Sequence, residues 1–157
     1  MRVARLPVSE DASAGRLFGP RKPRRTLYVA GPRLLRDTDA GGVVYYANYL
    51  KFTERARTEW LRALGFEQTD LAERHGIAFV VRSAAIDFMK PALFNDELRV
   101  TVELIKVGAG QIDLVQRVLR GDELLATAGV KVVCVRLGTM RPSRLPQPLA
   151  TRIRTPH

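Results

Sequence analysis

The segment DTDAGGVVYYANY, residues 37–49, gathers the residue types that could do chemistry in this chain. Asp37 and Asp39 are two carboxylates separated by one residue, and Gly41-Gly42 follows them. Because glycine has no Cβ, the backbone there can turn sharply and approach a ligand closely. A carboxylate so placed can act on a carbonyl carbon as a nucleophile, or as a general base for water. The segment is therefore a candidate site for acyl transfer or hydrolysis.

The residues after this motif predict the second half of such a site, the N-terminus of a helix. From Tyr46 the apolar residues recur every three or four positions, through Tyr49, Ala56, Trp60 and Leu64, which is the period of an amphipathic helix. The first N–H groups of a helix have no partner inside it and carry partial positive charge. They could stabilise an oxyanion that forms when a carboxylate just before the helix attacks or activates water.

The residue types alone leave other roles open. Asp37 and Asp39 also suit a turn or a helix N-cap. Metal binding is a third option, but the nearest histidine in sequence is His75 and no cluster of ligands surrounds the two aspartates, so we expect no metal. Tyr45 and Tyr46 suit core positions or a dimer contact as well as a ligand site.

Composition predicts a single folded domain. The chain has 157 residues and 46% hydrophobic content, which is enough for a packed core. It has no apolar run of membrane-spanning length, and its first residues lack the apolar stretch of a secretory signal. The single cysteine, Cys134, cannot form an internal disulfide and lies in an apolar run. We therefore expect it to be buried in a cytoplasmic protein.

The net charge of +10 would suit a nucleic-acid partner, but its distribution does not. Residues 1–25 hold seven Lys/Arg and two acids, and residues 141–157 hold four Arg and no acids. Residues 26–140 hold fifteen bases against fourteen acids. We therefore predict a basic, flexible extension over 1–25, a folded domain over 26–140 and a Pro/Arg-rich tail over 141–157. The four prolines of that tail predict an extended, unpaired chain, and no nucleic-acid partner is expected.

The remaining patterns predict an α+β fold in which a long antiparallel sheet wraps around one central helix. The predicted elements are a strand over 26–36 bent at Gly31-Pro32, helices over 46–64 and 67–76, and strands over 77–89, 97–107, 111–119 and 123–137. The strand over 77–89 is long and apolar. Left unpaired at a sheet edge it would promote aggregation, so we expect an edge-to-edge dimer.

The stretch DTDAGGVVYYANYLKFTERARTEWLRALG resembles the signature of the 4-hydroxybenzoyl-CoA thioesterase family, in its YbgC-like acyl-CoA thioesterase branch. The resemblance continues through GIAFVVRSAAIDFMKPALFNDELRV and VKVVCVRLGTMRPSRLP and covers about residues 27–148. It implies a hotdog fold that forms a homodimer or a homotetramer. It also implies hydrolysis of an acyl-CoA thioester with no cofactor, since coenzyme A is part of the substrate.

The resemblance implies roles for individual residues. Asp39 matches the family's catalytic carboxylate, as nucleophile or general base, and the backbone N–H of Tyr46 matches its oxyanion donor. Val44, Tyr45 and Asn48 fall where the substrate is expected. YbgC-like proteins commonly have histidine where this chain has Tyr46, so no histidine contribution to proton transfer is expected here.

Three cations lie in regions that resemble the family's coenzyme A contacts: Arg82, Lys106 and Arg144. They could bind its phosphates, or they could be ordinary surface charges. Two other functions remain open on the same fold. A hotdog dehydratase would pair a histidine with a carboxylate, and the helix over 46–64 has no histidine. The alternative to an enzyme is a non-catalytic module, which would have the same fold and bind acyl-CoA or acyl-carrier protein without turnover.

Overall fold

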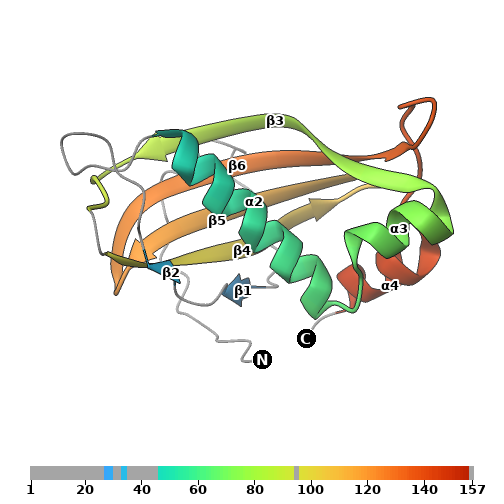
Figure 1. Cartoon of the computed structure of the whole chain (residues 1–157). Coiled ribbons are helices and arrows are strands. Elements are labelled where there is room, and N and C mark those ends of the chain that lie inside the picture. Colours follow the sequence, from blue (N-terminus) through green and yellow to red (C-terminus); the bar gives the residue numbers. More distant parts are fainter. Residues whose placement is uncertain (1–26, 30–32, 35–45, 94–95, 156–157) are drawn as a thin grey trace.

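The computed structural model describes residues 27–29, 33–34, 46–93 and 96–155. These residues form two layers, an antiparallel sheet and helices packed on it (Figure 1). The elements are, in chain order, β1 (Leu27–Val29), β2 (Arg33–Leu34), α2 (Tyr46–Ala63), α3 (Gln68–His75), β3 (Ile77–Phe88), β4 (Glu97–Val107), β5 (Gln111–Arg120), β6 (Glu123–Arg136) and α4 (Gln147–Arg154).

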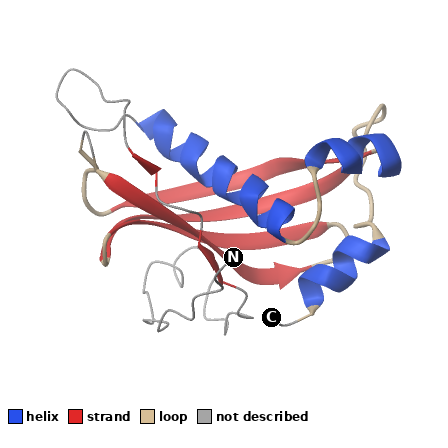
Figure 2. Cartoon of the chain, turned by 60° about the horizontal axis from the view of Figure 1, so that its bottom comes forward, coloured by secondary structure: helices blue, strands red, loops and turns tan. Residues whose placement is uncertain are grey.

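The sheet has the strand order β1-β4-β5-β6-β3, and β2 also pairs with β4. Every strand pair is antiparallel. The long helix α2 crosses one face of the curved sheet, and α3 and α4 lie together at one end of it (Figures 1 and 2). This arrangement confirms the predicted α+β class with one long helix on the sheet. It also places β3 at an edge of the sheet, as the predicted edge-to-edge dimer requires.

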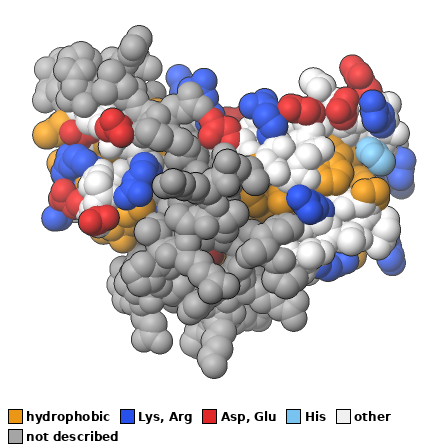
Figure 3. Space-filling model, turned by 90° about the horizontal axis from the view of Figure 1, so that it is seen from below, with side chains coloured by type: hydrophobic (Ala, Val, Ile, Leu, Met, Phe, Trp, Pro, Cys, Tyr) orange, Lys and Arg blue, Asp and Glu red, His pale blue; other side chains and the backbone are white. Residues whose placement is uncertain are grey.

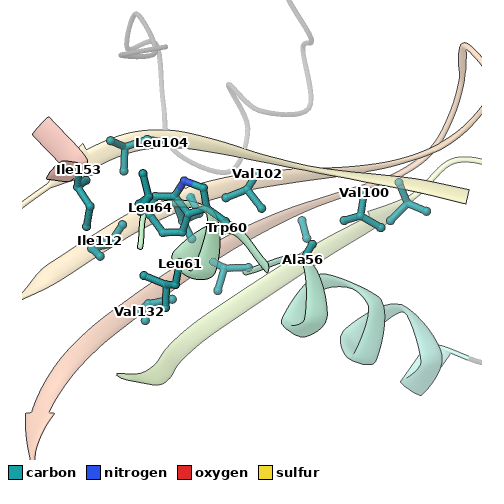
Figure 4. Close-up of a cluster of buried hydrophobic side chains, with 14 of the residues drawn as sticks. Ala56, Trp60, Leu61, Leu64, Val100, Val102, Leu104, Ile112, Val132 and Ile153 are labelled. Carbon is teal, nitrogen blue, oxygen red and sulfur yellow. The ribbon is translucent and has the colours of Figure 1, made fainter. Parts of the chain in front are cut away.

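The core forms where α2 meets the sheet, because both elements are apolar on the facing side. Ala56, Trp60 and Leu61 of α2, with Leu64 directly after its end, pack toward the strands (Figure 4). The residues of β4 and β5 that point toward the helix alternate with residues that point to the other face of the sheet, as in any strand. These inward residues are Leu98, Val100, Val102 and Leu104 of β4 and Ile112, Leu114, Gln116 and Val118 of β5.

A single glycine after its last turn terminates α2. Gly65 has φ +92, a left-handed conformation that residues with a Cβ rarely adopt. Its N–H donates to the carbonyl of Arg62 at 2.9 Å, and the N–H of Phe66 donates to the carbonyl of Leu61 at 3.0 Å. This pair of bonds is the Schellman motif that closes a helix. It confirms the predicted stop and gives α2 its 18 residues, or about 27 Å.

The first predicted strand is in fact two short strands. β1 and β2 each pair with β4, at Leu27–Val29 against Thr101–Glu103 and at Arg33–Leu34 against Glu97–Leu98. The predicted bend at Gly31-Pro32 lies outside the described residues, as do the extension over 1–25 and Pro156.

The prediction of an extended, unpaired C-terminal tail is wrong. Residues 147–154 form the helix α4, whose Leu149 and Ile153 are buried, and Pro142 bridges to Val135 of β6. The four prolines favour an extended chain, but the first turn of a helix needs no N–H from a proline. Pro146 is the N-cap and Pro148 lies in the first turn of α4. The apolar spacing of Leu149 and Ile153, four residues apart, was the signal for this helix.

Leu149→Ala tests this correction, because Leu149 is 0% exposed. Loss of a buried leucine side chain is expected to lower the free energy of unfolding by about 2–5 kcal/mol, measured by urea denaturation. Arg152→Ala on the exposed side of the same helix is the control and should change it little. Equal stability of the two variants would mean that α4 does not pack on the domain.

Candidate active site

The candidate site is centred on the start of helix α2. Tyr46 is the first residue of this helix, which confirms the helix start predicted from periodicity. Asn48 lies in the same first turn. The other predicted residues of the motif, namely Asp37, Asp39, Val44 and Tyr45, lie outside the described residues. The roles assigned to all of them stay predictions.

Tyr49 fixes the first turn of α2 against the end of β3. It is 2% exposed, and its hydroxyl accepts a hydrogen bond from the N–H of Ala92 at 3.1 Å. Its ring meets that of Phe88 edge to face, with centroids 5.0 Å apart, a favourable geometry for aromatic pairs. Burial raises the pKa of the Tyr49 hydroxyl. The helix start is thus held by a buried, neutral tyrosine.

Charged side chains hold the segment that follows β3 at the same end of the sheet. Arg120 Nη1 contacts Asp96 Oδ2 at 2.6 Å and Arg120 Nη2 contacts Glu123 Oε2 at 3.1 Å, while Lys90 Nζ lies 2.9 Å from Glu123 Oε1. The same Asp96 oxygen accepts the N–H of Leu93 at 2.8 Å. Lys90 and Arg120 lower the pKa of the Glu123 carboxyl. This network secures the segment that carries Ala92, the partner of Tyr49.

A cavity of about 470 Å³ runs along one side of α2. Its helix wall consists of residues spaced three and four apart, which lie on one stripe of the helix. Its other wall is the helix-facing side of β3, β5 and β6. The lining residues are Leu50, Thr53, Glu54, Arg57, Trp60 and Leu61 of α2, Gln68 of α3, and Phe79, Val81, Ala84, Ile86, Ile112, Leu114, Ala128, Val130 and Val132 of the sheet.

Among the lining residues that the structure describes, Arg57 is the one cation of this mostly apolar cavity. Arg57 Nη1 donates to Gln116 Oε1 at 2.9 Å, and Gln116 Nε2 donates to the carbonyl of Thr53 at 2.9 Å. Gln116 is 0% exposed. Burial lowers the pKa of the half-buried Arg57 guanidinium. Sequence reasoning missed Arg57 as a site residue, although its place within the apolar stripe of α2 was a signal.

The three predicted coenzyme A cations lie toward the other end of the sheet. Arg82 Nη1 donates to Gln111 Oε1 at 3.2 Å, and Lys106 pairs in register with Asp113. Arg144 lies beside Gly110. A Cβ added to Gly110 would be 3.9 Å from the Cα of Arg144 and 2.3 Å from the carbonyl oxygen of Ser143. The structure thus gathers all three around the turn between β4 and β5, away from the start of α2 in the same chain.

The described residues contain no group of three or more His, Cys, Asp or Glu that could hold a metal ion. None of the helices that the structure describes is long and apolar enough to cross a membrane. On the side of the molecule drawn in Figure 3, basic and acidic side chains alternate over the described surface instead of forming one basic face.

A family model for the thioesterase-like superfamily matches residues 34–153 of the chain, from β2 to α4. The chain belongs to the thioesterase-like superfamily. Members of this superfamily with a curated name include the acyl-CoA thioesterase YbgC of Haemophilus influenzae, 50% identical over 111 residues, or 71% of this chain and 82% of that protein. The acyl-CoA thioester hydrolase YbgC of Escherichia coli is 42% identical over 120 residues, or 75% of this chain and 88% of that protein.

Solved structures of the superfamily confirm the fold. A probable thioesterase from Bartonella henselae superimposes with a TM-score of 0.72 at 34% identity, covering 77% of this chain and 100% of that chain. The 1,4-dihydroxy-2-naphthoyl-CoA thioesterase Slr0204 from Synechocystis gives a TM-score of 0.74 at 27% identity, covering 82% and 96%. The predicted hotdog fold and the predicted YbgC-like resemblance are therefore both confirmed.

Tyr49→Phe tests how the start of α2 is held. The change keeps the ring but leaves the Ala92 N–H without its acceptor, so the free energy of unfolding should fall by about 1–3 kcal/mol in urea denaturation. An unchanged stability would mean that the hydroxyl does not anchor this turn.

The same variant has a pH signature. Because the pKa of Tyr49 is raised above its ordinary 10.0 in the fold, its contribution to stability is complete below pH 10.0 and is lost as pH rises above that value. Tyr49→Phe should remove this part of the alkaline loss of stability, which a pH series of the same denaturation experiment measures.

Proposed function

We propose that this protein hydrolyses an acyl-CoA thioester to the free acid and coenzyme A. The observation that carries the proposal is the start of α2 at Tyr46, four positions after the last glycine of the DTDAGG motif, on the helix that lines the cavity. The names of its YbgC relatives support the same activity. A thioester carbonyl placed at this helix start would meet the partial positive charge of the first N–H groups.

Asp39 supplies the reactive carboxylate by either of two routes. As a general base it takes a proton from water, whose oxygen then attacks the thioester carbon. As a nucleophile it attacks that carbon itself, and water later hydrolyses the resulting anhydride. In both routes the Tyr46 N–H stabilises the oxyanion of the tetrahedral intermediate. Cleavage of the C–S bond then releases coenzyme A as a thiolate, which needs no strong general acid.

The remaining motif residues bind the substrate next to the reacting carbonyl. Val44 and Tyr45 precede the helix and contact the thioester, and Asn48 in the first helical turn orients Asp39 or the ligand. The reaction requires no metal and no redox cofactor. The predicted cytoplasmic location stays a prediction.

Two copies of the chain complete each site. In one chain the cations around the β4–β5 turn lie toward the far end of the sheet from the start of α2. The edge strand β3 has its Phe88 end beside Tyr49. Antiparallel pairing of β3 with the β3 of a second copy brings the far end of one sheet beside the start of α2 in the other. We therefore assign Arg82, Lys106 and Arg144 to coenzyme A bound in the partner's site, with a homotetramer as a dimer of such dimers.

Asp39→Asn tests the catalytic carboxylate. It should lower kcat for thiol release from a panel of short-chain, long-chain and aromatic acyl-CoAs by at least about 100-fold. Binding of the same thioesters, measured by calorimetry, should persist. Asp37→Asn is the matched control, because Asp37 is the other aspartate of the same motif, two positions before Asp39. This variant should lose far less activity. Equal turnover in the Asp39→Asn variant and in the unaltered protein contradicts the mechanism. If the unaltered protein binds the thioesters but hydrolyses none of them, a binding module is supported instead.

Hybrid dimers test the shared site. A variant with Lys106→Met and Arg144→Met should show a raised KM for acyl-CoA, since it lacks two phosphate contacts. Co-refolding it with Asp39→Asn should restore activity above that of either parent, because one site of the hybrid then has both an intact Asp39 and intact cations. No gain over the parents would contradict the assignment of the cations to the partner's site.

A further inference from the structure

The sheet side of the cavity along α2 is apolar, whereas its helix side carries the polar or charged residues Thr53, Glu54, Arg57 and Gln68. Nine of its lining residues come from the sheet and all are aliphatic or aromatic: Phe79, Val81, Ala84, Ile86, Ile112, Leu114, Ala128, Val130 and Val132. Such walls suit a hydrocarbon chain. The guanidinium of Arg57 borders the same space from the helix side, and an alkyl chain alone offers this cation no partner.

Arg57 is held in place but not neutralised. Its one hydrogen bond among the described residues goes to the neutral amide of Gln116, and no ion pair joins it to a carboxylate there. Glu54, three residues earlier on the same helix, also lines the cavity, but it is exposed and interacts with Arg57 only through longer-range electrostatics. An arginine has five N–H donors, so most of those on Arg57 remain available to a ligand.

The support for Arg57 is rigid. Gln116 is 0% exposed and Thr53 is 3% exposed, and the amide of Gln116 joins the Thr53 carbonyl of α2 to the guanidinium. A cation in an apolar, partly buried cavity loses hydration, and an anionic ligand restores the lost interaction. The lowered pKa of Arg57 has the same cause, its burial.

The distance between the start of α2 and Arg57 determines how long an acyl chain can reach from one to the other. Eleven residues separate Tyr46 from Arg57, which is about 16 Å along the helix axis. Side chains on a helix lean toward its N-terminus, so the guanidinium lies closer to Tyr46 than its own Cα does. Leu50, Thr53 and Glu54 line the interval. A thioester carbonyl at the Tyr46 N–H would therefore extend its acyl chain along this stripe toward Arg57.

We propose that Arg57, positioned by Gln116, binds a carboxylate at the far end of the acyl group, so that the preferred substrates are coenzyme A monothioesters of dicarboxylic acids. This inference rests on the proposed function and names the substrate class of the same site. A plain alkyl chain of equal length would leave the guanidinium without a partner in the cavity and would bind less well.

Kinetics with matched pairs of thioesters tests the proposal. The pairs are adipoyl- with hexanoyl-CoA, suberoyl- with octanoyl-CoA and sebacoyl- with decanoyl-CoA, each pair differing only in the terminal carboxylate. The dicarboxylic member of at least one pair should have the higher kcat/KM. In Arg57→Met, which keeps an unbranched apolar stem and removes the charged guanidinium, the ratio within that pair should fall by about tenfold or more.

Two further variants separate recognition from folding. Gln116→Glu places a carboxylate next to Arg57 and should abolish the preference while the arginine remains. Arg55→Met removes an exposed arginine of the same helix and should leave the ratio unchanged. Circular dichroism and thermal unfolding establish that each variant is folded.

The outcomes are distinct from those that test hydrolysis. A ratio near one in the unaltered protein, or a ratio that Arg57→Met leaves unchanged, overturns the proposal while thioester hydrolysis stands. The same holds if Arg57→Met changes only the sedimentation of the dimer, since Arg57 would then contact the partner subunit. If no thioester is hydrolysed, the proposed function fails. In that case calorimetry measures the affinity of Asp39→Asn for both thioesters of each pair. Equal affinities within each pair overturn the proposed role of Arg57.

Discussion

The burial of one long helix against a curved sheet is the constraint on which the rest of this structure depends. Trp60, 4% exposed, and Leu61, 5% exposed, fill the space between α2 and the strands. Full burial of such a side chain contributes about 1.5–3 kcal/mol. The indole N–H of Trp60 is the one buried side-chain polar atom among the described residues that lacks a hydrogen-bond partner. Trp60 therefore stabilises the fold through its apolar area, and this packing holds α2 against the sheet.

The position of the helix start decides the chemistry. A helix N-terminus has partial positive charge wherever it lies, but it acts on a substrate only if it is held still beside a pocket. Tyr49 holds it through Ala92, and the ion pairs of Arg120 hold the segment around Ala92 in turn. In the proposed function, the cavity along the same helix receives the acyl chain attached to the reacting carbonyl. In the proposed function, one helix provides the oxyanion donor at its start and the acyl-binding wall along its side.

Most of the fold could be predicted from the sequence because its signals are local. The alternation in β4 and the glycine at position 65 each specify an element without help from distant residues. Helix α4 was missed because its prolines outweighed the spacing of Leu149 and Ile153, and only packing against the domain shows that this spacing is used. Among site residues, Tyr46 was found from the change of periodicity at the helix start.

Arg57 could not be found in that way. Its role depends on Gln116, which is 59 residues away in sequence, and no local pattern relates the two. A polar residue within an apolar stripe is a signal only when its partner on the sheet is known. The same limit applies to Arg82, Lys106 and Arg144, which resemblance singled out and which only the strand register brings to one turn.

The most direct test of this account is a crystal structure of the Asp39→Asn variant with sebacoyl-CoA, a thioester that this variant should bind without turnover. The account predicts the thioester oxygen at the N–H of Tyr46, the acyl chain along the side of α2 and its carboxylate at Arg57. A thioester carbonyl bound away from the start of α2 would contradict the central claim that this helix start is where the thioester is hydrolysed.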